Sequence, residues 1–102
     1  TLNVASEKKA YTLADRGTFL AIRKNLGLTI LNEGDAALLN IYHVIEVNGA
    51  KWPKANTEGA KAFADFMVSK KTQSIIKTFG VDKYGSPLFF PDAGKKVEDL
   101  GK

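Results

Sequence analysis

Cysteine is absent from the sequence, which excludes disulfide bonds, thiol catalysis and metal sites built on thiolates. Histidine occurs once, at His43, so no second histidine can complete a metal site, and we expect this side chain to be buried or simply hydrogen-bonded. The glycines lack the spacing and the Gly-Lys-Ser/Thr ending of a phosphate-binding loop, and no apolar run approaches the roughly 18 residues of a membrane span. No serine stands in the local context of a nucleophile. The sequence therefore predicts no catalytic site, no metal site and no enzyme.

Arginine is scarce, although the chain is basic. Lysines and arginines number 15 against 11 acidic residues, a net charge of +4, yet only Arg16 and Arg23 are arginines. Such a balance raises the question of a nucleic-acid partner. The lysines, however, are scattered in pairs such as Lys8-Lys9 and Lys70-Lys71, which is typical of a solvated surface. The pattern predicts no nucleic-acid partner, and a steep salt dependence of affinity would argue for one.

The length and composition indicate one small folded unit. With 102 residues, of which 44% are hydrophobic and 25% charged, the chain has the composition of a globular domain rather than of a disordered one. It opens with Thr1 instead of methionine, and residues 1–9 read as the end of a helix whose beginning is missing. We therefore expect a processed or trimmed part of a larger protein.

Helical and extended patterns alternate along the chain. Thr12 or Asp15 can cap a helix that ends at Gly27, and Asn56 and Ser69 can cap two further helical stretches. Runs of apolar, β-branched and aromatic residues predict four short strands, at residues 10–13, 28–31, 41–47 and 88–90, the last of which can instead form an aromatic plug. The alternation predicts the α/β class. So few strands leave sheet faces and edges uncovered, as in part of a larger α/β protein.

A polar and charged cluster opens the first capped helix, with Thr12, Asp15, Arg16 and Thr18 close together. In a purely structural interpretation the cluster is only a helix cap with a surface arginine beside it, and the residues from Thr12 to Asp15 have the form of a capping box. As a site it combines the unpaired N–H groups of a helix N-terminus with two hydroxyls and a planar guanidinium, all of which suit an oxyanion. Asp15 would repel an anion unless it caps the helix or pairs with Arg16. Both interpretations stay open on these residues.

Three stretches of the sequence together carry a family resemblance: ASEKKAYTLADRGTFLAI, NIYHVIEVNGAKWPKANTEGAKAFADFMVS and FGVDKYGSPLFFPDA. They resemble the C-terminal part of the tungstate-binding proteins of bacterial ABC transporters, which are type II periplasmic binding proteins. The most specific pieces are Tyr11-Thr12-Leu13-x-Asp15-Arg16-Gly17-Thr18, Val44-Ile45-x-Val47-Asn48 and Glu58-Gly59-Ala60. Gly49 stands where the family usually has proline, and the family's Thr/Ser-rich anion loop and Ser-Arg-Gly-Asp segment are not among these residues.

The resemblance implies a two-lobed α/β protein whose lobes close on an oxyanion at the hinge. On that assignment residues 1–31 finish the second lobe, residues 32–47 cross the hinge, and residues 48–102 form the C-terminal part of the first lobe. The implied protein is an extracytoplasmic or periplasmic solute-binding protein, held at the membrane through its transporter or a lipid anchor. Its ligand is tungstate or a similar oxyanion such as molybdate, its partner is the permease of an ABC importer, and no cofactor is implied. The fragment alone is expected to self-associate through its open sheet.

Within this resemblance we expect Thr12 and Arg16 to bind the oxyanion, with Tyr11, Asp15 and Thr18 as supporting residues. Arg16 would serve the site either directly or by fixing its wall, and Arg23 is expected on the outer surface. The alternative from another class is the effector-sensing domain of a cytoplasmic transcription regulator, which can use the same two-lobed architecture. A DNA-binding segment before Thr1 would favour the regulator, whereas a signal or lipoprotein leader would favour the transporter.

Overall fold

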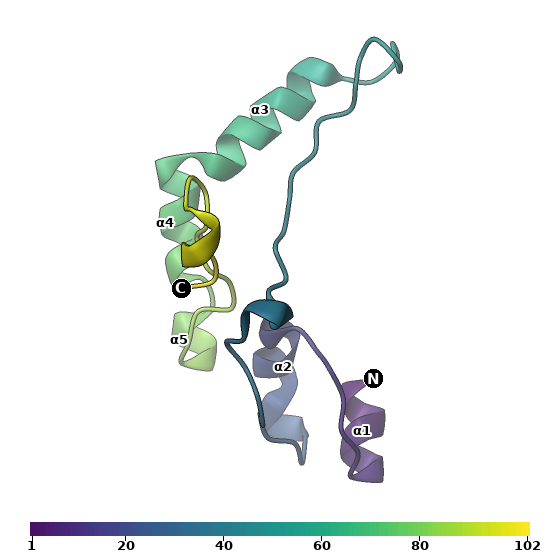
Figure 1. The fold of residues 1–102 in the computed structure, drawn as a ribbon, viewed down its shortest axis with the longest axis vertical. Helices are drawn as coiled ribbons and strands as arrows, with labels where there is room; N and C mark the ends of the chain where they lie inside the picture. Colours follow the sequence, from purple (N-terminus) through teal and green to yellow (C-terminus); the bar gives the residue numbers. More distant parts are fainter.

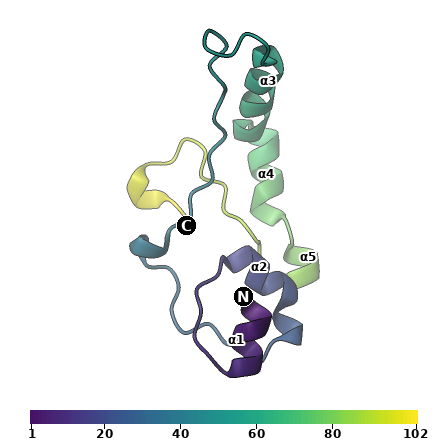
Figure 2. The same ribbon diagram turned by 90° about the vertical axis from the view of Figure 1, so that its right-hand side faces the viewer.

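Most of the secondary structure of this chain is helical, and the helices are spread along an elongated body. A computed structural model describes residues 1–102, with principal extents of 50 × 27 × 27 Å and a Cα radius of gyration of 17.2 Å. A compact domain of about 100 residues has a radius of about 13 Å. In Figures 1 and 2 the helices α1 and α2 lie at one end of the long axis and the start of α3 lies at the other.

The structure has five α-helices and three short 3₁₀ helices, and no helix has both the length and the apolar character needed to cross a bilayer. The α-helices are α1 (Leu2–Lys8), α2 (Arg16–Ile22), α3 (Thr57–Val68), α4 (Lys70–Thr78) and α5 (Val81–Tyr84). The 3₁₀ helices are η1 (Arg23–Asn25), η2 (Ala36–Leu38) and η3 (Val97–Asp99).

The predicted helix caps are confirmed. Asn56 accepts a hydrogen bond from the Gly59 amide at 2.8 Å, and Ser69 accepts one from Thr72 at 3.3 Å while its own hydroxyl donates to the Phe66 carbonyl. The residues around Ser69 therefore form two helices, α3 and α4, instead of one bent helix. Caps of this kind satisfy the free N–H groups of a first helical turn from within a few residues.

The four predicted strands do not form within these residues: the structure contains no β-strand and in this respect departs from the α/β class. Residues 41–47 run as an extended connection from η2 toward α3 without forming a ladder (Figure 1). A strand is stable only when a neighbour pairs with its backbone N–H and C=O groups. No second segment of these residues pairs with 41–47, so its backbone is extended but its sheet is missing. Its side chains are exposed, except for the half-buried Ile41.

Residues 88–90 follow the other alternative, an aromatic plug. The Phe89 ring meets the Tyr42 ring edge-to-face at 5.8 Å between centroids, and it lies 6.3 Å from the ring of Phe79, the C-cap residue of α4. The Leu88 amide donates to the Phe79 carbonyl at 3.0 Å. Phe89 thus joins the extended connection to the end of α4.

The hydrophobic core is small. Leu2 and Ala5 of α1 and Leu20 of α2 are its buried apolar residues. Many large apolar side chains are exposed instead, including Ile45 at 85% and Trp52 at 59% of their surface. Most of the large apolar side chains therefore lie outside the core.

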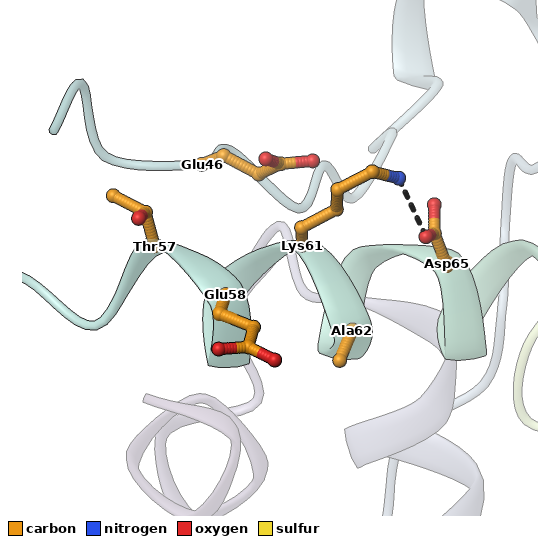
Figure 3. A pocket seen from close by; sticks show the side chains of 6 residues that line it. All are labelled: Glu46, Thr57, Glu58, Lys61, Ala62 and Asp65. Atoms are coloured by element: carbon orange, nitrogen blue, oxygen red, sulfur yellow. Dashed lines mark hydrogen bonds and ion pairs between the residues drawn. The ribbon is translucent and has the colours of Figure 1, made fainter.

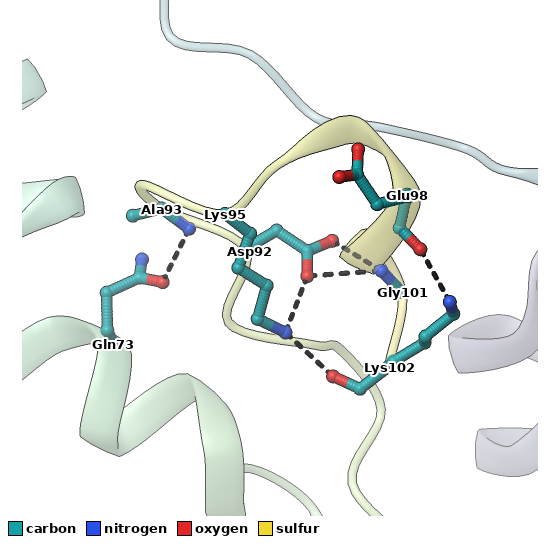
Figure 4. Close-up of polar contacts among 7 residues, drawn as sticks. All are labelled: Gln73, Asp92, Ala93, Lys95, Glu98, Gly101 and Lys102. Carbon is teal, nitrogen blue, oxygen red and sulfur yellow. Dashed lines mark hydrogen bonds and ion pairs between the residues drawn. The ribbon is translucent and has the colours of Figure 1, made fainter.

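The polar C-terminal tail folds back beside α4 through a set of hydrogen bonds (Figure 4). The carboxylate of Asp92 accepts from the Gly101 amide at 3.0 and 3.1 Å and from the Lys95 ammonium at 3.0 Å. The side-chain oxygen of Gln73 in α4 accepts from the Ala93 amide at 3.1 Å. The hydrogen bond between Gln73 and Ala93 holds the start of the tail against α4.

Candidate functional site

The residues from Tyr11 to Thr18 connect α1 to the first turn of α2. The Tyr11 side chain is 90% exposed, and Thr12 is exposed as well. The Thr12 hydroxyl lies 3.5 Å from the Leu13 carbonyl, at the outer limit of a hydrogen bond. Both hydroxyls are therefore free to bind a group from solvent.

Asp15 is the N-cap of α2, which decides between the two candidates for that position. Its Oδ2 accepts from the Thr18 amide at 2.8 Å. This backbone hydrogen bond, followed by one from the Thr18 side chain, lowers the pKa of Asp15 from its usual value of 3.8. The capping box that would start at Thr12 does not form. The carboxylate of Asp15 itself occupies the end of this seven-residue helix, where the sequence allowed an anion.

Arg16 points from the first turn of α2 toward the C-terminal half of the chain. Its Nη1 donates to the Pro87 carbonyl, and its guanidinium carbon lies 5.5 Å from the centre of the Phe90 ring. Its Nε lies 3.8 Å from the Glu33 carboxylate, and both side chains are partly exposed, so this ion pair contributes little to stability. The guanidinium is thus already engaged by a carbonyl, a ring and a carboxylate.

Arg23 makes a similar contact one helical stretch further along. It is exposed, as expected, but its Nη2 donates to the Tyr84 carbonyl at 3.3 Å. Sequence reasoning did not identify the residues that these two arginines contact. The aromatic run before Pro91 was the available signal, since Arg and aromatic side chains stack favourably.

The predicted site residues do not form one contact network. Asp15 and Thr18 meet through the cap, whereas Arg16 turns to Pro87 and Phe90. Asp15 and Thr18 also line a cavity of about 330 Å³ between α1 and α2, and no arginine or lysine lines it. The cavity is lined by Thr1, Leu2, Asn3, Leu13, Ala14, Asp15, Thr18 and Ile22.

A second, larger cavity of about 470 Å³ lies along α3 and is unsuited to an anion (Figure 3). Glu46, Glu58 and Asp65 line it together with a single cation, Lys61. The Lys61 ammonium donates to Asp65 at 2.7 Å, and this contact raises the pKa of Lys61. The positive charge of Lys61 is therefore already paired with the Asp65 carboxylate. The acidic and histidine side chains of the chain form no cluster placed to hold a metal ion.

His43 differs from expectation. It lies in the extended connection, where it is exposed and makes no hydrogen bond through its side chain. The expectation of a buried or bonded histidine assumed a sheet around residues 41–47. Without that sheet, neither burial nor a hydrogen-bond partner is available.

Comparison with known proteins gives one family and several relatives. Residues 1–71 match the family described as PBP superfamily domain. The tungstate-binding protein TupA of Peptoclostridium acidaminophilum is 51% identical over 94 residues, which are 92% of this chain and 33% of that protein. A protein of Haloferax volcanii, provisionally named ABC transporter anion-binding protein, is 46% identical over 100% of this chain and 31% of its own length. TupA of Campylobacter jejuni is 36% identical over 91% of this chain and 35% of its own length.

This chain therefore spans about a third of the length of the curated relatives that it matches. No solved structure matches it. The names of the three relatives describe proteins that bind tungstate or an anion.

Proposed function

The chain belongs to the PBP superfamily, and on that premise we propose that it forms part of a solute-binding protein that captures tungstate or a similar tetrahedral oxyanion for an ABC importer. The observation that carries the proposal is the 51% identity, over 92% of the chain, to a tungstate-binding protein. Two further relatives, whose names describe tungstate or anion binding, support it. A role as a transcription regulator is not favoured, because none of these names describes one.

The architecture that we propose is the two-lobed type II fold. Residues 1–31 belong to the second lobe, residues 32–47 cross the hinge, and residues 48–102 return to the first lobe. The extended backbone and exposed apolar side chains of residues 41–47 support a strand there that pairs with polypeptide outside these 102 residues. In the absence of such a partner, the same side chains favour self-association of the chain.

The ligand site that we propose includes the segment from Tyr11 to Thr18. The hydroxyls of Tyr11 and Thr12 donate to the oxyanion, since both are exposed and have no strong partner within the chain. Asp15 and Thr18 hold the adjoining helical turn through the cap. Arg16 completes the wall of the site.

Binding of this kind is noncovalent and needs no cofactor. Hydroxyl and amide donors around a tetrahedral oxyanion make charge-assisted hydrogen bonds, and closure of the two lobes removes water from them. The oxyanion is released unchanged to the transporter, so we propose a binding protein and not an enzyme. Its place is outside the cytoplasm, at the membrane beside the permease, held there by the transporter or a lipid anchor.

The test is titration calorimetry on the polypeptide as it is translated, whether or not it extends beyond these residues. Tungstate, molybdate and sulfate are titrated in parallel, and at least one of the first two is expected to bind with a saturable heat. Absence of binding for all three would refute the proposed function.

The site assignment is tested with Thr12→Ala, beside Thr29→Ala as the matched control. Thr29 is an exposed threonine that lies outside the candidate site. A hydrogen bond to a charged group contributes about 1.5–3 kcal/mol, so Thr12→Ala is expected to weaken tungstate binding about ten- to a hundredfold. Equal affinities for the two variants would remove Thr12 from the site and leave the proposed function standing.

A further inference from the structure

Residues 84–90, which we name the strap, leave α5 and pass between α4 and α2. The Leu88 amide at the centre of the strap donates to the Phe79 carbonyl, which ties the strap to α4. On its other side the strap lies against Gly17 of α2, which is buried. A Cβ atom on Gly17 would lie 3.5 Å from the Leu88 carbonyl oxygen and 3.6 Å from the Phe89 ring.

The two arginines of the chain both donate to carbonyl oxygens of the strap. Arg23 donates to Tyr84, and Arg16 donates to Pro87. These partners are 61 and 71 residues away in the sequence. A planar guanidinium can donate to a carbonyl and stack on a ring at the same time, and Arg16 does both, because Phe90 lies under it at 5.5 Å.

Arg16 is also the residue at which α2 begins, immediately after the Asp15 cap. The direction of the connecting segment, with Tyr11 and Thr12, depends on where this first turn is held. In α2 the burial of Leu20 holds the helix body, whereas its first turn is held by the Asp15 cap, by the packing of Gly17 against the strap and by the side chain of Arg16. The contact with the strap is therefore the long-range restraint on this turn.

We infer that Arg16 is a positioning residue, which latches the first turn of α2 to the strap and thereby orients the hydroxyls of Tyr11 and Thr12 for the oxyanion. This inference rests on the proposed function, and it assigns Arg16 to the wall of the site instead of to direct contact with the ligand. When the contact between Arg16 and the strap is lost, the donor hydroxyls of Tyr11 and Thr12 are still present, but their positions are less restricted. Binding then has to restrict that motion, which lowers affinity without removing a ligand contact.

The experiment is a double-mutant cycle on the polypeptide as it is translated, with Arg16→Ala, Phe90→Leu and the double variant. Phe90→Leu removes the ring from under the guanidinium while keeping apolar bulk in the strap. Each variant is measured twice, by tungstate titration and by hydrogen exchange of the backbone amides of residues 88–90. Lys24→Ala is the control, because Lys24 is exposed and makes neither a hydrogen bond nor an ion pair through its side chain.

Arg16→Ala is expected to weaken tungstate binding about tenfold, a loss of the size typical for residues that share one contact network. The same substitution is expected to speed hydrogen exchange of the backbone amides in the strap. Phe90→Leu is expected to weaken binding severalfold, and the double variant to bind about as weakly as Arg16→Ala alone. Lys24→Ala leaves both measurements at the parental value.

A loss of affinity in Arg16→Ala with unchanged strap exchange and no effect of Phe90→Leu would overturn the inference, because Arg16 would then contact the oxyanion directly. Additive losses in the double variant would also overturn it. If the parent binds none of tungstate, molybdate and sulfate, the proposed function fails and the assigned role of Arg16 fails with it, while the exchange measurements still decide whether Arg16 latches the strap.

Discussion

Around Phe89, aromatic side chains from distant parts of the chain meet, whereas along residues 41–47 apolar side chains meet almost nothing. Tyr42 is the residue at which the two regions touch, since its ring contacts Phe89 although it is itself 69% exposed. Three positions further on, Ile45 is 85% exposed. Both regions have the apolar composition of a protein interior, so composition alone does not distinguish them. The difference is that Phe89 has aromatic partners among these residues, whereas Ile45 has no such partner among them.

The largest expected effect is at Ile45. In the proposed two-lobed fold a sheet partner covers this side chain, so Ile45→Ala in the polypeptide as it is translated should lower the free energy of unfolding by about 2–4 kcal/mol. Val97→Ala, at an exposed position of η3, should change it by less than about 0.5 kcal/mol. Urea unfolding measures both, and equally small changes would mean that Ile45 has no partner.

The same position controls the association expected of the 102-residue chain. Light scattering should show oligomers that increase with concentration, and Ile45→Lys should reduce them, because a charge on an open strand edge opposes pairing between chains. A monomer at every concentration would contradict the expectation of an uncovered edge.

A smaller effect is expected at Phe89. Phe89→Ala should lower the free energy of unfolding by about 2 kcal/mol, less than for a fully buried phenylalanine because the ring is 39% exposed. A cycle with Tyr42→Ala, followed by urea unfolding, should give a coupling of about 0.5–1 kcal/mol for the edge-to-face pair. Additive effects would show that the two rings stabilise the fold separately.

Local features of this fold were predictable from the sequence and distant ones were not. The caps at Asp15, Asn56 and Ser69 each involve residues within three positions, so a short stretch contains all of the interaction. A strand at 41–47 would depend on a partner, and no pattern within a segment specifies which backbone lies beside it.

The candidate site shows the same difference between local contacts, which were predictable, and distant ones, which were not. The capping role of Asp15 could be read from its neighbours, because the donor is Thr18. The partner of Arg16 could not, because Pro87 lies 71 residues away and offers only a backbone carbonyl, which every residue has. The type of side chain indicated that Arg16 binds an oxygen, but not which one.

The Asp15 cap gives the next smaller effect and a pH dependence. Asp15→Ala should cost about 1 kcal/mol of stability. Because the cap lowers the folded-state pKa of Asp15 below the 3.8 of the unfolded chain, its contribution is fully present above pH 3.8 and is lost as the pH falls through the folded-state pKa. Asp15→Asn keeps a capping oxygen without a charge, so urea unfolding of this variant should lack that part of the acid dependence. The same acid dependence in both proteins would assign it to other carboxylates.

The smallest expected effect is at Gly17, where α2 meets the strap. A Cβ there would be in ordinary van der Waals contact with Leu88 and Phe89, at 3.5 and 3.6 Å, so alanine fits. Since alanine restricts the unfolded chain more than glycine does, Gly17→Ala should raise the free energy of unfolding by about 0.5 kcal/mol. Gly85, at the start of the strap, is the matched control: its φ of 76° is left-handed and nothing lies near its missing Cβ, so Gly85→Ala should destabilise by about 1 kcal/mol through backbone strain alone. Opposite signs for the two variants in urea unfolding would confirm that the strap contacts α2 without crowding it. Destabilisation by both variants would mean that the strap and α2 approach each other more closely at Gly17 than these distances show.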